Sequence, residues 1–168
     1  MHKPKILVLD IETAPSLGYF WSIWNTNIGI SQLVNTSKVI CFAAKWLGEK
    51  KIHFHSDHKS THKKVIKEAW DLVNEADAII GYNSQPFDMK VLNREFLLEG
   101  MPKPDIYKNI DLLKTVKSNF RFVSNKLDHI SQELGIGKKT SHQGFDLWQS
   151  CMNGDSKAWK LMEKYNKN

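Results

Sequence analysis

The sequence predicts an α/β domain in which a mixed five-stranded sheet is flanked by helices. Two features predict this class: short runs rich in branched apolar residues, typical of strands, and apolar residues that later recur at helical spacing. Strands with a hairpin come first and helices then alternate with strands, an order that favours one sheet with helices packed on it. The length of 168 residues fits a single domain covering residues 1–168.

The first three strands are expected in the N-terminal third of the chain. Residues 5–11 and 38–46 are apolar, rich in branched side chains and of strand length. A turn signal at Gly48-Glu49-Lys50 separates the second strand from residues 51–55. We interpret residues 51–55 as the returning strand of a hairpin.

Helical periodicity begins after this hairpin. Residues 65–76 carry an apolar stripe, residues 77–82 form a short strand, and a second helix follows. A further strand is expected over residues 106–110, and the last third reads as helical, with one stripe ended by Gly135. The residues expected to cap or close the first two helices are Ser60 or Thr61, Ser84, Pro86 and Gly100. The last two stripes consist of Leu127, Ile130 and Leu134, and of Ala158, Leu161, Met162 and Tyr165.

Composition excludes several classes of protein. No apolar run approaches the roughly 18 to 20 residues of a membrane span, and the N-terminal residues do not resemble a signal peptide. Cys41 and Cys151 are therefore interpreted as free thiols of a cytoplasmic protein. The net charge of +6 suggests a polyanionic partner, although lysines that merely keep the domain in solution would give the same charge.

The most informative residues are Asp10 and Glu12 in the first predicted strand. Side chains two positions apart on a strand share a face, so two like charges would meet there. Burial and repulsion disfavour such a pair unless a divalent cation supplies positive charge. The pair therefore predicts a hard-metal site; alternatively, the strand ends at Leu9 and the acids begin a solvated loop.

Asp88 is a candidate third ligand. It falls in the first turn of the predicted second helix, where the helix dipole favours a carboxylate. If the strands that precede Asp10 and Asp88 are parallel neighbours, both acids lie at the carboxyl edge of the sheet. An ordinary aspartate at a helix N-terminus would give the same pattern.

Asp10-Ile11-Glu12-Thr13, followed by Asn83-x-x-x-Phe87-Asp88, resembles the first two motifs of the DEDD (DnaQ-like) superfamily of 3'–5' exonucleases. This resemblance implies a ribonuclease H-like fold and two Mg²⁺ or Mn²⁺ ions held by the carboxylates Asp10, Glu12 and Asp88. It also implies substrate contacts for Thr13, Asn83 and Phe87. Oxygen ligands suit these hard cations, which promote in-line phosphodiester hydrolysis.

The third motif of the tyrosine subclass is Tyr-x-x-x-Asp on the last helix. Tyr165 matches its tyrosine, which would orient the attacking water, but the sequence ends at Asn168, one residue before the expected aspartate. The last helix is therefore expected to be incomplete, through a shortened chain, an interrupted reading frame or a natural change of the site. Tyr165 also fits the apolar stripe of its helix.

The resemblance implies a 3'–5' exonuclease acting on single-stranded nucleic acid, with DNA favoured and RNA possible. The alternatives are a binding module without catalysis, or one part of a split enzyme that works with a polymerase or a complementing fragment. No membrane partner is expected.

Several weaker signals remain open. His53, His55, His58 and His62 resemble a zinc cluster, but no ligand is spaced to complete it, and a solvated basic edge is preferred. The aromatic loop 19–24 could stack on unpaired bases or cover the core. Lys138, Lys139 and His142 could contact phosphates or be exposed, and Asp111 is given no role.

Overall fold

A computed structural model describes residues 3–24, 26–142 and 144–168, so Met1 and His2 of the N-terminal segment lie outside the described residues. The central sheet has five strands in the order β5-β4-β1-β6-β7. β1 pairs antiparallel with β4 and parallel with β6, and this mixed pairing confirms the predicted fold class. The strands are β1 (Ile6–Thr13), β4 (Val39–Trp46), β5 (His53–Ser56), β6 (Ala78–Gly81) and β7 (Lys108–Asp111).

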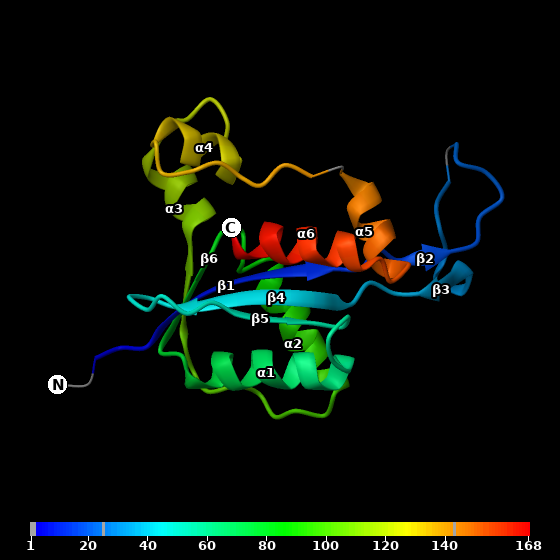
Figure 1. The fold of residues 1–168 in the computed structure, drawn as a ribbon, viewed down its shortest axis with the longest axis horizontal. Helices are drawn as coiled ribbons and strands as arrows, with labels where there is room; N and C mark the ends of the chain where they lie inside the picture. Colours follow the sequence, from blue (N-terminus) through cyan, green and yellow to red (C-terminus); the bar gives the residue numbers. More distant parts are fainter. Residues whose placement is uncertain (1–2, 25, 143) are drawn as a thin grey trace.

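Helices cover both faces of the sheet (Figure 1). The core beneath the sheet joins β1 and β4 to α1 and α2, whereas α5 and α6 pack against β4 on the other face. α3 and α4 stand together as a projection beside the C-terminal end of α6 (Figure 1). The helices are α1 (His62–Glu75), α2 (Asp88–Leu98), α3 (Leu112–Asn119), α4 (Leu127–Glu133), α5 (Phe145–Met152) and α6 (Ser156–Lys167).

The second helix begins later than its sequence predicts. Ser84 was expected to cap it, but α2 starts at Asp88, and the Ser84 hydroxyl is buried without a hydrogen-bond partner among the described residues. The reason is a tight turn over residues 84–87, in which the Ser84 carbonyl accepts the Met89 N–H at 2.9 Å. Asp88 nevertheless lies in the first helical turn, as predicted.

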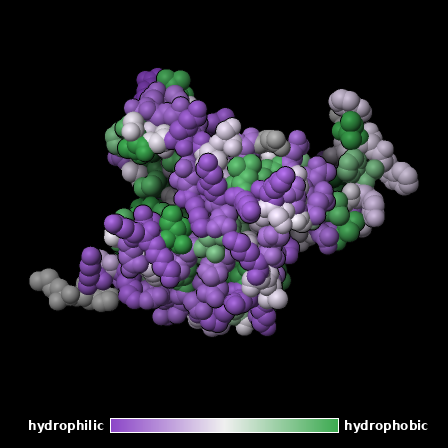
Figure 2. Space-filling view, in the orientation of Figure 1, coloured by the Kyte–Doolittle hydropathy of each residue, from purple (hydrophilic) through white to green (hydrophobic). Residues whose placement is uncertain are grey.

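An arm projects from the end of β1. Its base is a small ladder of β2 (Leu17–Gly18) and β3 (Leu33–Asn35), and η1 (Ile30–Gln32) precedes β3. Trp21 is 102% exposed and Trp24 is 78% exposed, so the aromatic loop does not cover the core. Its surface is hydrophobic or weakly polar (Figure 2). Stacking of these aromatics on bases stays a prediction.

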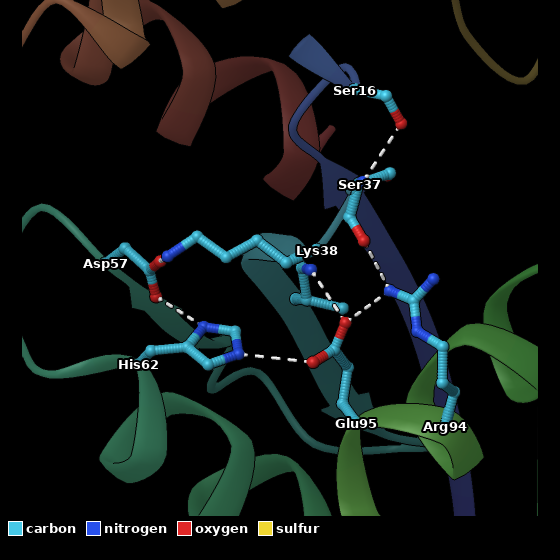
Figure 3. Close-up of polar contacts among 8 residues, drawn as sticks. Ser16, Ser37, Lys38, Asp57, His62, Arg94 and Glu95 are labelled. Carbon is cyan, nitrogen blue, oxygen red and sulfur yellow. Dashed lines mark hydrogen bonds and ion pairs between the residues drawn. The ribbon is translucent and has the colours of Figure 1, made fainter. Parts of the chain in front are cut away.

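A polar network fixes the start of β4 (Figure 3). The buried Glu95 side chain of α2 accepts hydrogen bonds from Arg94 at 2.5 Å and from the Val39 N–H at 3.4 Å. The two ring nitrogens of His62 lie 3.1 Å from an Asp57 oxygen and 3.2 Å from a Glu95 oxygen. These contacts tie α1 and α2 to the strand end that pairs with the last residues of β1.

Candidate functional site

Asp10 and Glu12 share one face of β1, as their spacing predicts. Leu7, Leu9 and Ile11 alternate with them and are buried in the core beneath the sheet. The two acids therefore face the α6 side, where Asn166 of α6 donates to Asp10 Oδ2 at 2.9 Å. The strand continues to Thr13, so the acids lie within β1 and do not begin a loop.

Asp88 reaches β1 from the first turn of α2. β6 pairs with β1 only as far as Val8 and Ile80, and the following part of β1 lacks a parallel neighbour in the sheet. The Ile11 N–H donates to Asp88 Oδ1 at 3.1 Å instead. Asp88 thus provides a hydrogen-bond acceptor for β1 beyond the point where β6 stops pairing with it. This contact places Asp88 at the end of β1.

The turn that carries Asp88 is shaped by its neighbours. A Cβ atom at Gly81 would lie 2.5 Å from the Ser84 Cβ, so only glycine fits this close approach. The Asp111 carboxylate accepts the N–H groups of Asn83 at 2.9 Å and Gln85 at 3.1 Å. Asn83 has a φ of 63°, a conformation that asparagine tolerates better than most residues. Asp111, which was given no role from the sequence, is therefore a positioning residue.

The three carboxylates carry more negative charge than the protein balances. Burial and the neighbouring charge of Asp10 raise the pKa of Glu12 to about 8. The same two causes raise the pKa of Asp88 to about 7. Loss of hydration also raises the pKa of Asp10, although its side chain keeps an exposed surface and Lys139 and Asn166 oppose the shift. Each carboxylate is thus harder to ionise than an ordinary one unless positive charge is supplied.

The charge of Lys139 lowers the pKa of both Asp10 and Glu12. Its ammonium lies 4.4 Å from the centre of the Tyr165 ring. Burial lowers the pKa of Lys139, but the hydrogen bond with Tyr165 and the charges of Tyr165, Asp10 and Glu12 outweigh it and raise the value. Tyr165 is 8% exposed and also contacts the ring of His142 at 4.6 Å. Tyr165 therefore lies in the core and beside the carboxylates at once.

The predicted substrate residues lie around these acids. Asn83 and Phe87 are exposed in the turn before Asp88. Thr13 lines an open groove of about 580 Å³ at the end of β1, together with Trp148 of α5. Sequence reasoning missed Asn166, whose contact with Asp10 spans 156 positions, because no local pattern marks so distant a pair.

The chemistry of the three carboxylates fits a hard divalent cation. Carboxylate oxygens are the ligands that Mg²⁺ and Mn²⁺ prefer, and Glu12 accepts no hydrogen bond from the described residues. Within residues 3–24, 26–142 and 144–168, no three His, Cys, Asp or Glu side chains are gathered closely enough to hold a metal as they stand. Binding an ion would therefore require these side chains to approach it further.

The four histidines do not form a zinc cluster. His62 lies in the polar network of Figure 3, His55 stacks on Phe42, and His58 stacks on Trp159. The preferred alternative, a solvated basic edge, does not describe them fully either, because three of the four have these specific partners.

Across the described residues, no helix is long and apolar enough to span a membrane.

Comparison with known proteins adds the family. Residues 29–168 match the RNase H superfamily, a range that contains Asp88 and Tyr165 but begins after Asp10 and Glu12. No curated protein sequence matches the chain. The fold is similar to the family B DNA polymerase from the hyperthermophilic archaeon Pyrobaculum calidifontis, with a TM-score of 0.68 and 19% sequence identity. The similarity covers 98% of this chain and 23% of the polymerase chain.

The polymerase comparison concerns the fold, because the identity is low and most of the polymerase has no counterpart here. The family match is broader evidence, since it covers more than half of the sequence and includes four strands of the sheet. The strand order and the mixed pairing agree with it. The chain therefore belongs to the RNase H superfamily.

Proposed function

We propose that this chain is a metal-dependent 3'–5' exonuclease of single-stranded nucleic acid, with DNA favoured, and of the tyrosine-containing DEDD type. One observation supports the proposal: Asp88 is hydrogen-bonded to the end of β1, and the charge of Asp10 raises the pKa of both Glu12 and Asp88. The membership of the RNase H superfamily and the polymerase-like fold support nuclease chemistry.

Each residue has an expected role. Asp10, Glu12 and Asp88 would hold two Mg²⁺ or Mn²⁺ ions, which when bound neutralise phosphate charge and lower the pKa of a water molecule. Tyr165 would orient the attacking water, and the Lys139 ammonium lies over its ring. Thr13, in the groove at the end of β1, and Asn83 and Phe87, exposed in the turn before Asp88, would contact the terminal nucleotides.

The test is cleavage of a labelled oligonucleotide. A single strand labelled at its 5' end should shorten stepwise from the 3' end with Mg²⁺ or Mn²⁺ and stay intact with a chelator. An Asp10→Ala variant should be inactive, and Asp146→Ala, which removes an exposed acid of α5, serves as the matched control. Equal cleavage by Asp10→Ala and wild type would overturn the proposal.

A second candidate is a nucleic-acid-binding module without catalysis. Two observations favour it: the Asn166 amide donates to an Asp10 oxygen that a metal ion would otherwise use, and the described acids do not form a metal cluster. Titration with Mn²⁺ separates the candidates. Two sites of similar affinity support the nuclease, whereas one weak site or none supports the binding module.

A polymerase or a complementing fragment is the proposed protein partner. The support is the similarity to one part of a much longer DNA polymerase chain. A stable complex of purified components, with faster strand shortening than either component alone, is the expected result. Unchanged shortening on mixing would count against such a partner.

A further inference from the structure

The segment from residue 112 to residue 127 forms most of the α3–α4 projection seen in Figure 1. It contains Lys114, Lys117, Arg121 and Lys126, and no aspartate or glutamate. None of these four cations forms an ion pair with a carboxylate among the described residues. All four are exposed, so their positive charge faces solvent.

Apolar and aromatic side chains alternate with these cations. Phe120 is 59% exposed and Val123 is 95% exposed, although both are residues that usually prefer burial. The rings of Phe120 and Phe122 lie 6.0 Å apart and are tilted by 49°. Purple and green surface accordingly lie side by side on this projection in Figure 2.

Both ends of the segment are fastened to the carboxylate site. Asp111, immediately before it, holds the turn that carries Asp88, and the Tyr82 hydroxyl donates to the Asn125 carbonyl at 2.6 Å. Asp128, immediately after it, accepts the N–H of Lys139 at 2.7 Å. The segment is therefore fixed relative to the turn that carries Asp88 and to Lys139.

We propose that residues 112–127 form a binding surface for the single strand upstream of its 3' terminus. The cations would neutralise phosphates, and Phe120 would stack on an unpaired base. The direction of the bound strand, with its 3' end at the acids, rests on the proposed nuclease function. The binding of a single strand to this surface does not depend on cleavage.

The charge distribution favours nucleic acid over other partners. An apolar protein interface is depleted of charge at its centre, whereas cations here alternate with the exposed apolar side chains. An anionic membrane would also attract the cations, and the experiment therefore includes anionic vesicles. The arm of residues 17–35, by contrast, has aromatic residues but no charged residue.

The experiment measures binding of labelled oligothymidylates by fluorescence anisotropy in a chelator, so that no cleavage occurs. The Lys117→Gln/Arg121→Gln variant should bind a decanucleotide about tenfold or more weakly and lower the salt slope by about one to two. Phe120→Ala should weaken binding by about fivefold or more without changing the salt slope. The matched control is Leu47→Ala/Lys50→Ala, which removes an exposed apolar group and a cation at the hairpin turn.

A trinucleotide has too few phosphates and bases to engage all of these side chains at once, so the variants should weaken its binding less than that of the decanucleotide. Equal losses for the control and the test variants would overturn the inference, as would stronger binding to vesicles containing phosphatidylserine than to the decanucleotide. Circular dichroism melts identify variants that have lost the fold. If wild type binds through this surface but never shortens a strand, the inference stands and the exonuclease proposal fails.

Discussion

Two groups of acidic side chains in this fold differ in how their charge is balanced. Glu95 and Asp57, between α1, α2 and β4, are held by Arg94, by His62 and by Lys38, whose ammonium lies 2.6 Å from Asp57 (Figure 3). At the end of β1, by contrast, the acids have few partners. Glu12 accepts no hydrogen bond from the described residues, and its pKa is raised to about 8 by burial and by Asp10.

The difference separates a structural role from a functional one. A buried carboxylate with cationic partners stabilises a particular packing, and removing one partner leaves an uncompensated charge. Carboxylates that repel one another without such partners lower stability unless a ligand compensates them. The first group should therefore determine stability, and the second should determine activity.

Asp10→Ala should show the largest effect on activity. We expect cleavage to fall by about a thousandfold or more, because the central metal ligand is lost. The free energy of unfolding of the metal-free protein should not decrease, since a charge that raises the pKa of both Glu12 and Asp88 is removed. Strand-shortening rates and chemical denaturation in a chelator measure the two quantities.

His62→Ala should show the opposite behaviour. The free energy of unfolding should fall by about 2 kcal/mol, because the buried Glu95 carboxylate loses a hydrogen-bond partner. Activity at low temperature should remain within about threefold of wild type, because His62 lies outside the carboxylate site. If His62→Ala were as inactive as Asp10→Ala but as stable as wild type, the distinction between the two groups of acids would be contradicted.

Lys139→Met should reduce activity by about tenfold near neutral pH. Lys139 lowers the pKa of Asp10 and Glu12, so its removal raises both values, and the active, deprotonated form then requires higher pH. The rising limb of the pH–rate profile should therefore move to higher pH. Lys138→Met is the control, since the adjacent lysine has no such interaction with either acid.

The pH dependence of stability should show the smallest effect. Folded Glu12 and Asp88 have pKa values of about 8 and about 7, against ordinary values of 4.5 and 3.8. The folded protein thus holds protons that the unfolded chain has released, and stability falls as pH rises through this window. In chelator, Tm should decrease less with rising pH in Asp10→Asn than in wild type, by a few degrees. An identical dependence of Tm on pH in wild type and Asp10→Asn would contradict the coupling of Asp10 to Glu12 and Asp88.

The sequence predicts the sheet better than the details around it. The strand β1 and the faces of Asp10 and Glu12 follow from alternation, and α1 follows from its apolar stripe. The start of α2 was wrong because a tight turn at Ser84 competes with helix formation. α3 and α5 were not predicted individually, whereas the shorter α4 was, because its apolar residues recur at i, i+3 and i+7.

Some residues of the site could likewise be predicted from the sequence, and others could not. Asp88 could be predicted because a strand, a turn and a helix lie together in the sequence. Asn166 and Lys139 could not, because their contacts with the acids depend on how α6 and the segment before α5 fold back over β1. Asp111 gave no local signal either, since it acts through backbone groups of a distant turn.

The central claim is that the unbalanced acids at the end of β1 form a site for divalent cations. Calorimetric titration with Mn²⁺ at about pH 7, in buffers of different ionisation enthalpy, tests it most directly because it counts released protons. Since the pKa values of Glu12 and Asp88 are raised to about 8 and about 7, binding should release about one proton or more. Asp10→Ala should abolish both binding and release, whereas His62→Ala should retain both. Wild-type binding without proton release, or no binding at millimolar Mn²⁺, would contradict the account.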